Sequence, residues 1–311
     1  MLRSFLLLLI AIVPALAQNG PAFQFQAKRI VFLGDSITHA GGYIAYLDAE
    51  LIARGVSPRP ELINLGLPSE TCSGLSEPRH PFPRPDVHER LDRALLKTKP
   101  DVVVACYGMN DGVYYPFGED RFERYKEGIE KIGLKVKAAG AKLILMTPTV
   151  FDPPPTKPNK NLLPLGEKEY SWVNPYKDYD QDVLARYGEW ILTRTNSADM
   201  LVDLRKPLLA ALKAKRARDA MFVFAPDGVH INDSGHAMVA KAIANAWGLN
   251  GDLQAKKELV VWVRKKQNLM HSAWLSHVGH KRPGMKAGLS LKEAKARTVE
   301  FDKKIAELLQ D

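Results

Sequence analysis

Short apolar runs recur along the chain, each about the length of a β-strand. They occupy residues 29–33, 61–65, 101–105, 142–146 and 200–203. Runs of this length that are rich in Val, Ile and Leu are typical of strands buried in a parallel sheet. Stretches with helical spacing lie between or after them, at residues 43–54, 87–97, 122–139, 179–195, 207–215 and 234–247. This alternation predicts an α/β fold in which helices cover both faces of a parallel sheet.

Two segments interrupt this pattern because they are crowded with proline. Residues 76–86 and 152–166 are therefore predicted to be two long loops, and the second includes Pro153-Pro154-Pro155. Loops at the carboxyl edge of such a sheet shape the ligand pocket. We therefore expect these two segments to set specificity.

The first residues have the pattern of a secretory signal peptide. A basic start at Arg3 is followed by an apolar run from Phe5 to Val13 and by the small-residue site Ala15-Leu16-Ala17. The apolar run is too short to cross a bilayer. We predict a signal peptide at residues 1–17, a secreted or periplasmic location, and no membrane span in the mature chain.

The length of the remaining chain predicts one sizeable α/β domain over residues 18–250 and a mostly helical extension over 251–311. The extension is basic, with 13 Lys and Arg against 6 Asp and Glu over residues 255–311, and it contains a helical stretch at 291–309. Its charge fits either solvated helix faces or contact with an acidic polymer or anionic surface. No basic run is interleaved with aromatic residues, so nucleic acid is not an expected partner. The sequence does not indicate an oligomeric state.

Cys72 and Cys106 are the only cysteines. Export permits a disulfide between them, whereas the position of Cys106 at the end of an apolar run favours a packed thiol. The sequence leaves both arrangements open.

Polar and glycine-rich signatures come directly after three of the predicted strands. They are Gly34-Asp35-Ser36, Asn64-Leu65-Gly66 and Gly108-Met109-Asn110-Asp111. Ligand sites in parallel sheets lie beyond the carboxyl ends of the strands. One edge of the sheet should therefore collect all three signatures and form the site.

Ser36 is a candidate nucleophile in this set. A serine between a strand and a helix can also be a plain helix cap, and it needs a neighbouring base to react. His230 can supply that base, because Asp227, three residues earlier, can bond one imidazole nitrogen and leave the other for the serine proton. The alternative is an exposed His230 that follows a simple turn.

The remaining requirement is a set of donors for an oxyanion. The N–H groups of Gly66 and Ser36 and the side-chain amide of Asn110 are suitable donors for the tetrahedral intermediate of ester cleavage. Each also has a common structural role, since Gly66 can form a turn and Asn110 can cap a loop.

Taken together, these blocks and Asp227-Gly228-Val229-His230 resemble the four blocks of the SGNH/GDSL hydrolase superfamily, over about residues 28–248. The resemblance implies a three-layer α/β/α, flavodoxin-like fold with a five-stranded parallel sheet. It implies a catalytic group of Ser36, Asp227 and His230 and an oxyanion hole of Ser36, Gly66 and Asn110, with no metal and no organic cofactor. No Gly-x-Ser-x-Gly elbow is present, which argues against the separate α/β-hydrolase fold.

These residues predict a serine esterase that works through an acyl-enzyme, with an extracellular acetylated carbohydrate as the simplest substrate. The alternatives are a lipase-like or arylesterase activity on small esters, and a non-catalytic carbohydrate-binding protein. His39 could line the pocket or lie at the surface. His271, His277 and His280 lack a cysteine or carboxylate at ligand spacing, so we predict no metal site there.

Overall fold

The computed structural model describes residues 26–155 and 161–310, and the predicted signal peptide lies outside the described residues. Its centre is a five-stranded parallel sheet with strand order β2-β1-β3-β4-β5. The predicted five-stranded parallel sheet is thus confirmed. The strands are β1 (Arg29–Gly34), β2 (Glu61–Asn64), β3 (Val102–Cys106), β4 (Lys142–Met146) and β5 (Met200–Val202).

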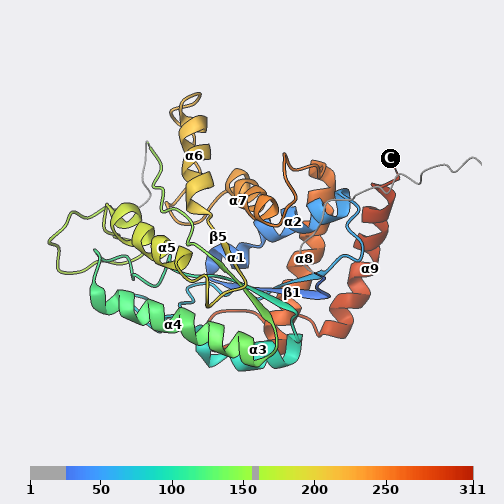
Figure 1. Cartoon of the computed structure of the whole chain (residues 1–311), viewed down its shortest axis with the longest axis horizontal. Coiled ribbons are helices and arrows are strands. Elements are labelled where there is room, and N and C mark those ends of the chain that lie inside the picture. Colours follow the sequence, from blue (N-terminus) through green and yellow to red (C-terminus); the bar gives the residue numbers. More distant parts are fainter. Residues whose placement is uncertain (1–25, 156–160, 311) are drawn as a thin grey trace, which may run out of the picture.

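Helices cover both faces of the sheet, so the predicted three-layer α/β/α fold is also confirmed. Figure 1 shows α2 and α7 on one side of the sheet and α3 and α4 on the other. The first layer consists of α1 (Ser36–Ala40), α2 (Gly42–Ala53) and α7 (Asp233–Ala246), with α6 (Arg205–Arg216) packed against α7. The second layer consists of α3 (Leu91–Thr98), α4 (Glu119–Ala138) and α5 (Ala185–Leu192). Tyr125 of α4 and Tyr187 of α5 stack with ring centroids 4.3 Å apart.

Two predicted helices differ in detail from the structure. The stretch at 87–97 divides into a 3₁₀ turn, Val87–Glu89, and α3, because Arg90 between them leaves the helical conformation and turns its side chain into the protein. The stretch at 179–195 begins with a π-helical turn, Asp180–Leu184, that continues into α5.

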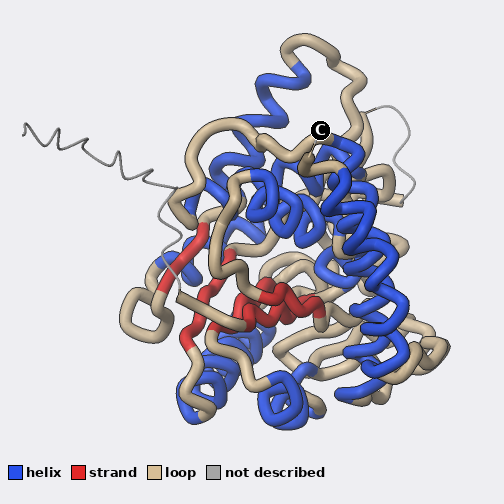
Figure 2. Tube along the Cα trace, turned by 90° about the vertical axis from the view of Figure 1, so that its right-hand side faces the viewer, coloured by secondary structure: helices blue, strands red, loops and turns tan. Residues whose placement is uncertain are grey.

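The C-terminal extension consists mainly of α8 (Lys257–Val278) and α9 (Leu291–Glu307). Helix α8 contacts α2, β2 and α3, which belong to the two layers and to the edge strand between them. It therefore covers the open edge of the sheet at β2, where unpaired backbone groups would otherwise be exposed. Helix α9 packs on α8, and Ser290 and Glu293 form a capping box at its start. Figure 2 shows the strands with helices above and below them in this view.

Among the described residues, no helix is both long enough and apolar enough to cross a membrane. Cys72 and Cys106 are not bonded to each other, which settles the alternative that the sequence left open. Cys72 is buried, and its thiol faces the backbone of Tyr125 at 3.9 Å.

Candidate active site

Ser36 is the first residue of α1, and Asp35 alone separates it from the end of β1. The helix cap is Asp35 rather than Ser36, because an Asp35 carboxylate oxygen accepts the N–H of Ile37 at 2.9 Å. The Ser36 hydroxyl is therefore not used as a cap. Burial raises the pKa of the Asp35 carboxyl to about 7, although the N–H of Ile37 and the nearby His230 act in the opposite direction.

His230 reaches Ser36 from the loop that precedes α7. Its Nε2 lies 2.8 Å from Oγ of Ser36, and its Nδ1 lies 2.7 Å from Oδ2 of Asp227. The second oxygen of Asp227 accepts the backbone N–H groups of Val229 and His230. The segment from Asp227 to His230 is a turn with Gly228 at φ +83°, and not part of a helix. This turn places the side chains of Asp227 and His230 within hydrogen-bond distance.

The Asp227 carboxylate remains ionised in this arrangement. Burial alone would raise its pKa, but the hydrogen bonds from His230 and from the N–H of Val229 outweigh burial and hold the pKa below its ordinary value. A charged Asp227 can accept a hydrogen bond from a protonated Nδ1 of His230. The other ring nitrogen, Nε2, then remains free to accept the serine proton.

Ser36 and His230 open into a pocket of about 230 Å³. Its other walls come from the segments after β2 and β3, from the proline-rich segment 76–86, and from later parts of the chain. The lining residues are Ser36, Pro68, Ser69, His80, Pro81, Phe82, Arg84, Asn110, Tyr114, Trp172, His230 and Arg282. The prediction that residues 76–86 shape the pocket is consistent with this lining.

Asn110 is held in the pocket wall with a fixed orientation. Its Oδ1 accepts the hydroxyl of Tyr114 at 3.0 Å, and its Nδ2 donates to the carbonyl of Glu70 at 3.2 Å. An amide nitrogen carries two N–H groups, so a second donor remains on the same atom.

Gly66 does not take the predicted position. Its N–H donates to Oδ1 of Asn64 at 2.8 Å, and Gly66 is not among the residues that line the pocket. A Cβ at Gly66 would lie 2.3 Å from the backbone nitrogen of His39. The glycine therefore allows the segment after β2 to pack against α1, and the assignment of Gly66 as an oxyanion donor needs correction.

Ser69 lines the pocket in its place. It has φ +67°, a left-handed conformation that is uncommon for a residue with a side chain. No hydrogen-bond acceptor for its N–H occurs among the residues that the structure describes. Strained backbone of this kind is often found at functional sites. The sequence gives no signal for it, because only the structure reveals the sign of φ.

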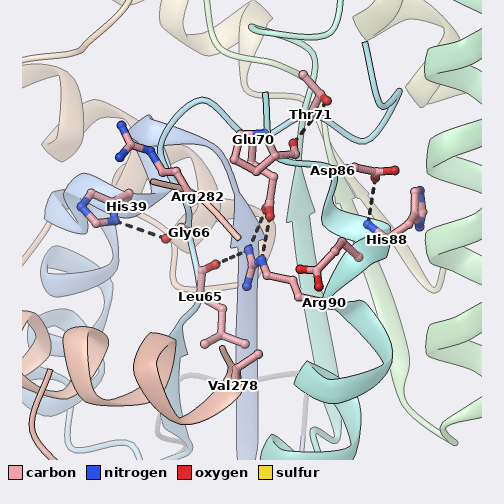
Figure 3. A network of polar contacts seen from close by, with 12 residues as sticks. His39, Leu65, Gly66, Glu70, Thr71, Asp86, His88, Arg90, Val278 and Arg282 are labelled. Atoms are coloured by element: carbon pink, nitrogen blue, oxygen red, sulfur yellow. Dashed lines mark hydrogen bonds and ion pairs between the residues drawn. The ribbon is translucent and has the colours of Figure 1, made fainter. Parts of the chain in front are cut away.

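A buried ion pair holds the segment that carries Ser69. Arg90 donates through Nε and Nη2 to the Glu70 carboxylate, both at 2.6 Å, and Nη2 also donates to the carbonyl of Leu65 at 2.7 Å (Figure 3). The hydroxyl of Tyr107 donates to the same carboxylate at 2.7 Å. These bonds tie the segment after β2 to the end of β3, so that Ser69 and Asn110 keep their relative positions.

His39 lies against the C-terminal extension rather than in the pocket wall. Its ring packs on that of His271 with centroids 4.6 Å apart, and both rings face the carbonyl of Gly66, at 3.3 Å and 3.1 Å. Burial lowers the pKa of both imidazoles, that of His271 to about 3. No group of His, Cys, Asp and Glu side chains placed to hold a metal is found in residues 26–155 and 161–310.

The sequence model of the GDSL-like Lipase/Acylhydrolase family matches residues 32–238, which make up most of the α/β fold and include Ser36, Asp227 and His230. The protein belongs to this family. It is therefore a hydrolase of the serine esterase type.

Several solved structures have a similar fold. A gut microbial diltiazem-metabolizing enzyme is 19% identical, with a TM-score of 0.57, over 72% of this chain and 47% of its own, so the chain spans about half the length of that enzyme. The acetylxylan esterase Axe2 from Geobacillus stearothermophilus is 21% identical, with a TM-score of 0.51, over 74% of this chain and 97% of its own. The acetyl xylan esterase AlAXEase is 26% identical, with a TM-score of 0.50, over 70% and 98%. A comparison with curated proteins gives no match.

Proposed function

We propose that the protein removes small acyl groups, most simply acetyl, from a carbohydrate outside the cytoplasm. The observation that carries the proposal is the continuous hydrogen-bond chain from Ser36 through His230 to Asp227 at the wall of a small pocket. A pocket of about 230 Å³ suits a short acyl group better than a long lipid chain. Phe82 and Trp172 offer aromatic surface for a sugar ring, and the acetyl xylan esterase AlAXEase is similar in fold and 26% identical.

The proposed mechanism is double displacement through an acyl-enzyme. Ser36 attacks the ester carbonyl while His230 takes its proton at Nε2, and Asp227 stabilises the resulting imidazolium. His230 then returns the proton to the leaving sugar hydroxyl. In the second half, His230 takes a proton from water, the hydroxide attacks the acyl-enzyme, and the proton returns to Ser36 as the carboxylic acid leaves.

We assign the oxyanion donors to the N–H of Ser36, the N–H of Ser69 and the side-chain amide of Asn110. Ser69 replaces Gly66 in this role because it lines the same pocket as Ser36 and Asn110. Donors held in place before the reaction stabilise the developing charge at no further cost of reorganisation.

The experiment is acetate release from a panel of acetylated polysaccharides and from p-nitrophenyl esters of increasing chain length, with Ser36→Ala as the blank. We expect release from at least one polysaccharide and a preference for the acetyl ester. Ser36→Ala should lower turnover by several orders of magnitude. Preference for long p-nitrophenyl esters with no release from sugars would favour a lipase-like enzyme. Binding of sugars without any Ser36-dependent release would favour a carbohydrate-binding protein.

Export is a separate part of the proposal, and it rests on the pattern of residues 1–17. Expression of the full chain in a bacterium with an outer membrane should place the protein in the periplasm or medium. Its N-terminal sequence should then begin at Gln18. An intact Met1 on a cytoplasmic protein would contradict export without touching the esterase assignment.

A further inference from the structure

The C-terminal extension contributes one side chain to the pocket. Arg282 follows α8 by a few residues, far beyond the match to the family at residues 32–238, and it lines the pocket together with Ser36 and His230. Its Nε donates to the carbonyl of Pro68 at 3.0 Å and its Nη1 to the carbonyl of Pro283 at 2.8 Å. Its guanidinium lies over the ring of Phe82, 4.9 Å from the centroid. Arg282 is therefore held beside Ser69 by contacts with the segment after β2.

In the part of the chain that the structure describes, the charge of Arg282 is not balanced by a carboxylate. Among the described residues, no Asp or Glu oxygen lies within ion-pair distance of Arg282, and its fixed contacts are to neutral carbonyls. Arg84 in the same pocket is different, because Glu77 accepts from its Nε and Nη2 at 2.6 and 2.7 Å. Asp227, the acid of the proposed catalytic group, is engaged with His230.

The available donors of Arg282 are arranged for an anion. Nε and one N–H of Nη1 are used, which leaves Nη2 without an acceptor in the described part of the chain. A guanidinium with unused N–H groups binds a carboxylate or sulfate through paired hydrogen bonds. The partial burial of Arg282 limits the competing hydration of such a pair.

We propose that Arg282 forms an anionic subsite and that the preferred substrate is an acylated acidic saccharide, with the ester at Ser36 and the acid group at Arg282. The inference rests on the proposed esterase function and narrows its substrate class. A carboxylate on a uronic acid and a sulfate ester on a neutral sugar present the same paired oxygens.

The test uses three acetylated methyl galactosides that differ only at C6: the hydroxymethyl form, the galacturonate and the 6-sulfate. With the full chain, kcat/KM should be at least about tenfold higher for one of the two anionic esters than for the neutral one. Arg282→Gln should reduce this ratio by about 10- to 100-fold, mainly through KM. Lys281→Gln is the matched control, since that side chain is 81% exposed and does not line the pocket, and it should leave the ratio unchanged. The anionic ester with the higher kcat/KM shows whether the natural substrate carries a carboxylate or a sulfate.

A wild-type enzyme that cleaves all three esters equally well, or a ratio that Arg282→Gln does not change, would overturn the anionic subsite while leaving the esterase intact. Absence of Ser36-dependent cleavage of every ester would instead overturn the proposed function. The subsite is still tested in that case by calorimetric binding of the three sugars to Ser36→Ala. Tighter binding of an anionic sugar that is lost in Ser36→Ala/Arg282→Gln supports the subsite, and equal binding of all three rejects it.

Discussion

Asp227 holds His230 at two places, since one carboxylate oxygen lies 2.7 Å from Nδ1 of the ring and the other accepts the backbone N–H of His230, also at 2.7 Å. The backbone bond fixes the position of the residue, and the side-chain bond fixes the tautomer of the ring. These two effects can be separated by mutation.

Asp227→Asn should preserve the first effect and remove the second. The amide oxygen can still accept the backbone N–H groups, but an NH₂ facing Nδ1 favours the tautomer that carries its proton on Nε2, which cannot accept from Ser36. We expect turnover of p-nitrophenyl acetate to fall by about 100- to 10,000-fold. Asp233→Asn, an exposed acid at the start of α7, is the control. Wild-type turnover in Asp227→Asn would remove Asp227 from the mechanism.

Asn110→Ala should slow the chemical step by removing an oxyanion donor. The expected loss is about 100- to 1000-fold in kcat with a smaller change in KM. Asn110 also bonds the carbonyl of Glu70 and the hydroxyl of Tyr114, so thermal unfolding should be measured on the same samples. Asn245→Ala, on the exposed surface of α7, is the control. A rise in KM with unchanged kcat would identify Asn110 as a substrate-binding residue instead.

Gly66→Ala should act on stability. The added Cβ would lie 2.3 Å from the His39 nitrogen and 2.5 Å from the Thr38 carbonyl carbon, and both neighbours are backbone atoms. Overpacking of this kind costs about 1–3 kcal/mol of unfolding free energy, measured by urea denaturation. Gly133→Ala is the matched control, because its Cβ would meet only ordinary contacts, the nearest at 3.5 Å, and a helical alanine should be neutral or stabilising. Unchanged stability in Gly66→Ala would contradict this close packing of the segment after β2 against α1.

Asp35→Asn should change how stability depends on pH. The folded protein binds the Asp35 proton up to about pH 7, whereas the unfolded chain releases it near pH 3.8. Between these values the folded state carries the extra proton, so the Asp35 contribution to stability is present at low pH and is lost as the pH rises toward 7. The Asp35→Asn variant keeps a neutral cap oxygen, and its stability relative to wild type should increase as the pH rises over this range. Urea unfolding at pH 5, 6, 7 and 8 tests this.

The control for this series is Asp92→Asn, whose side chain is 73% exposed. Its free energy of unfolding should change with pH in the same way as that of wild type. Parallel curves for Asp35→Asn as well would show that the Asp35 carboxyl is already ionised in the folded protein at pH 5.

The parts of the fold that the sequence predicts are those that local pattern determines. The run at residues 142–146 corresponds to β4, and 101–105 differs from β3 by one residue, because apolar β-branched runs specify buried strands directly. Helix α8 was harder to predict, since polar and apolar residues are mixed around it where it meets α2, β2 and α3.

The site residues also divide into those that a local sequence pattern marks and those that only tertiary contacts reveal. Ser36, Asn110, Asp227 and His230 belong to recognisable motifs. The structure brings Ser36, Asn110 and His230 to one pocket, and Asp227 is bonded to the far side of the His230 ring. Ser69 and Arg282 carry no such mark. The first depends on a positive φ, and the second depends on how an extension folds back over more than 200 residues of chain to reach Pro68. Neither property is encoded in local spacing.

The two unbonded thiols have a practical consequence for work with this protein. Burial raises the pKa of both the Cys72 and Cys106 thiols well above the ordinary value, so neither forms thiolate readily near neutral pH. The fold therefore requires no oxidant and no disulfide isomerase. Production in a reducing bacterial cytoplasm, from a gene that lacks residues 1–17, should give the same fold, and thiol reductants can be kept in assay buffers without loss of structure.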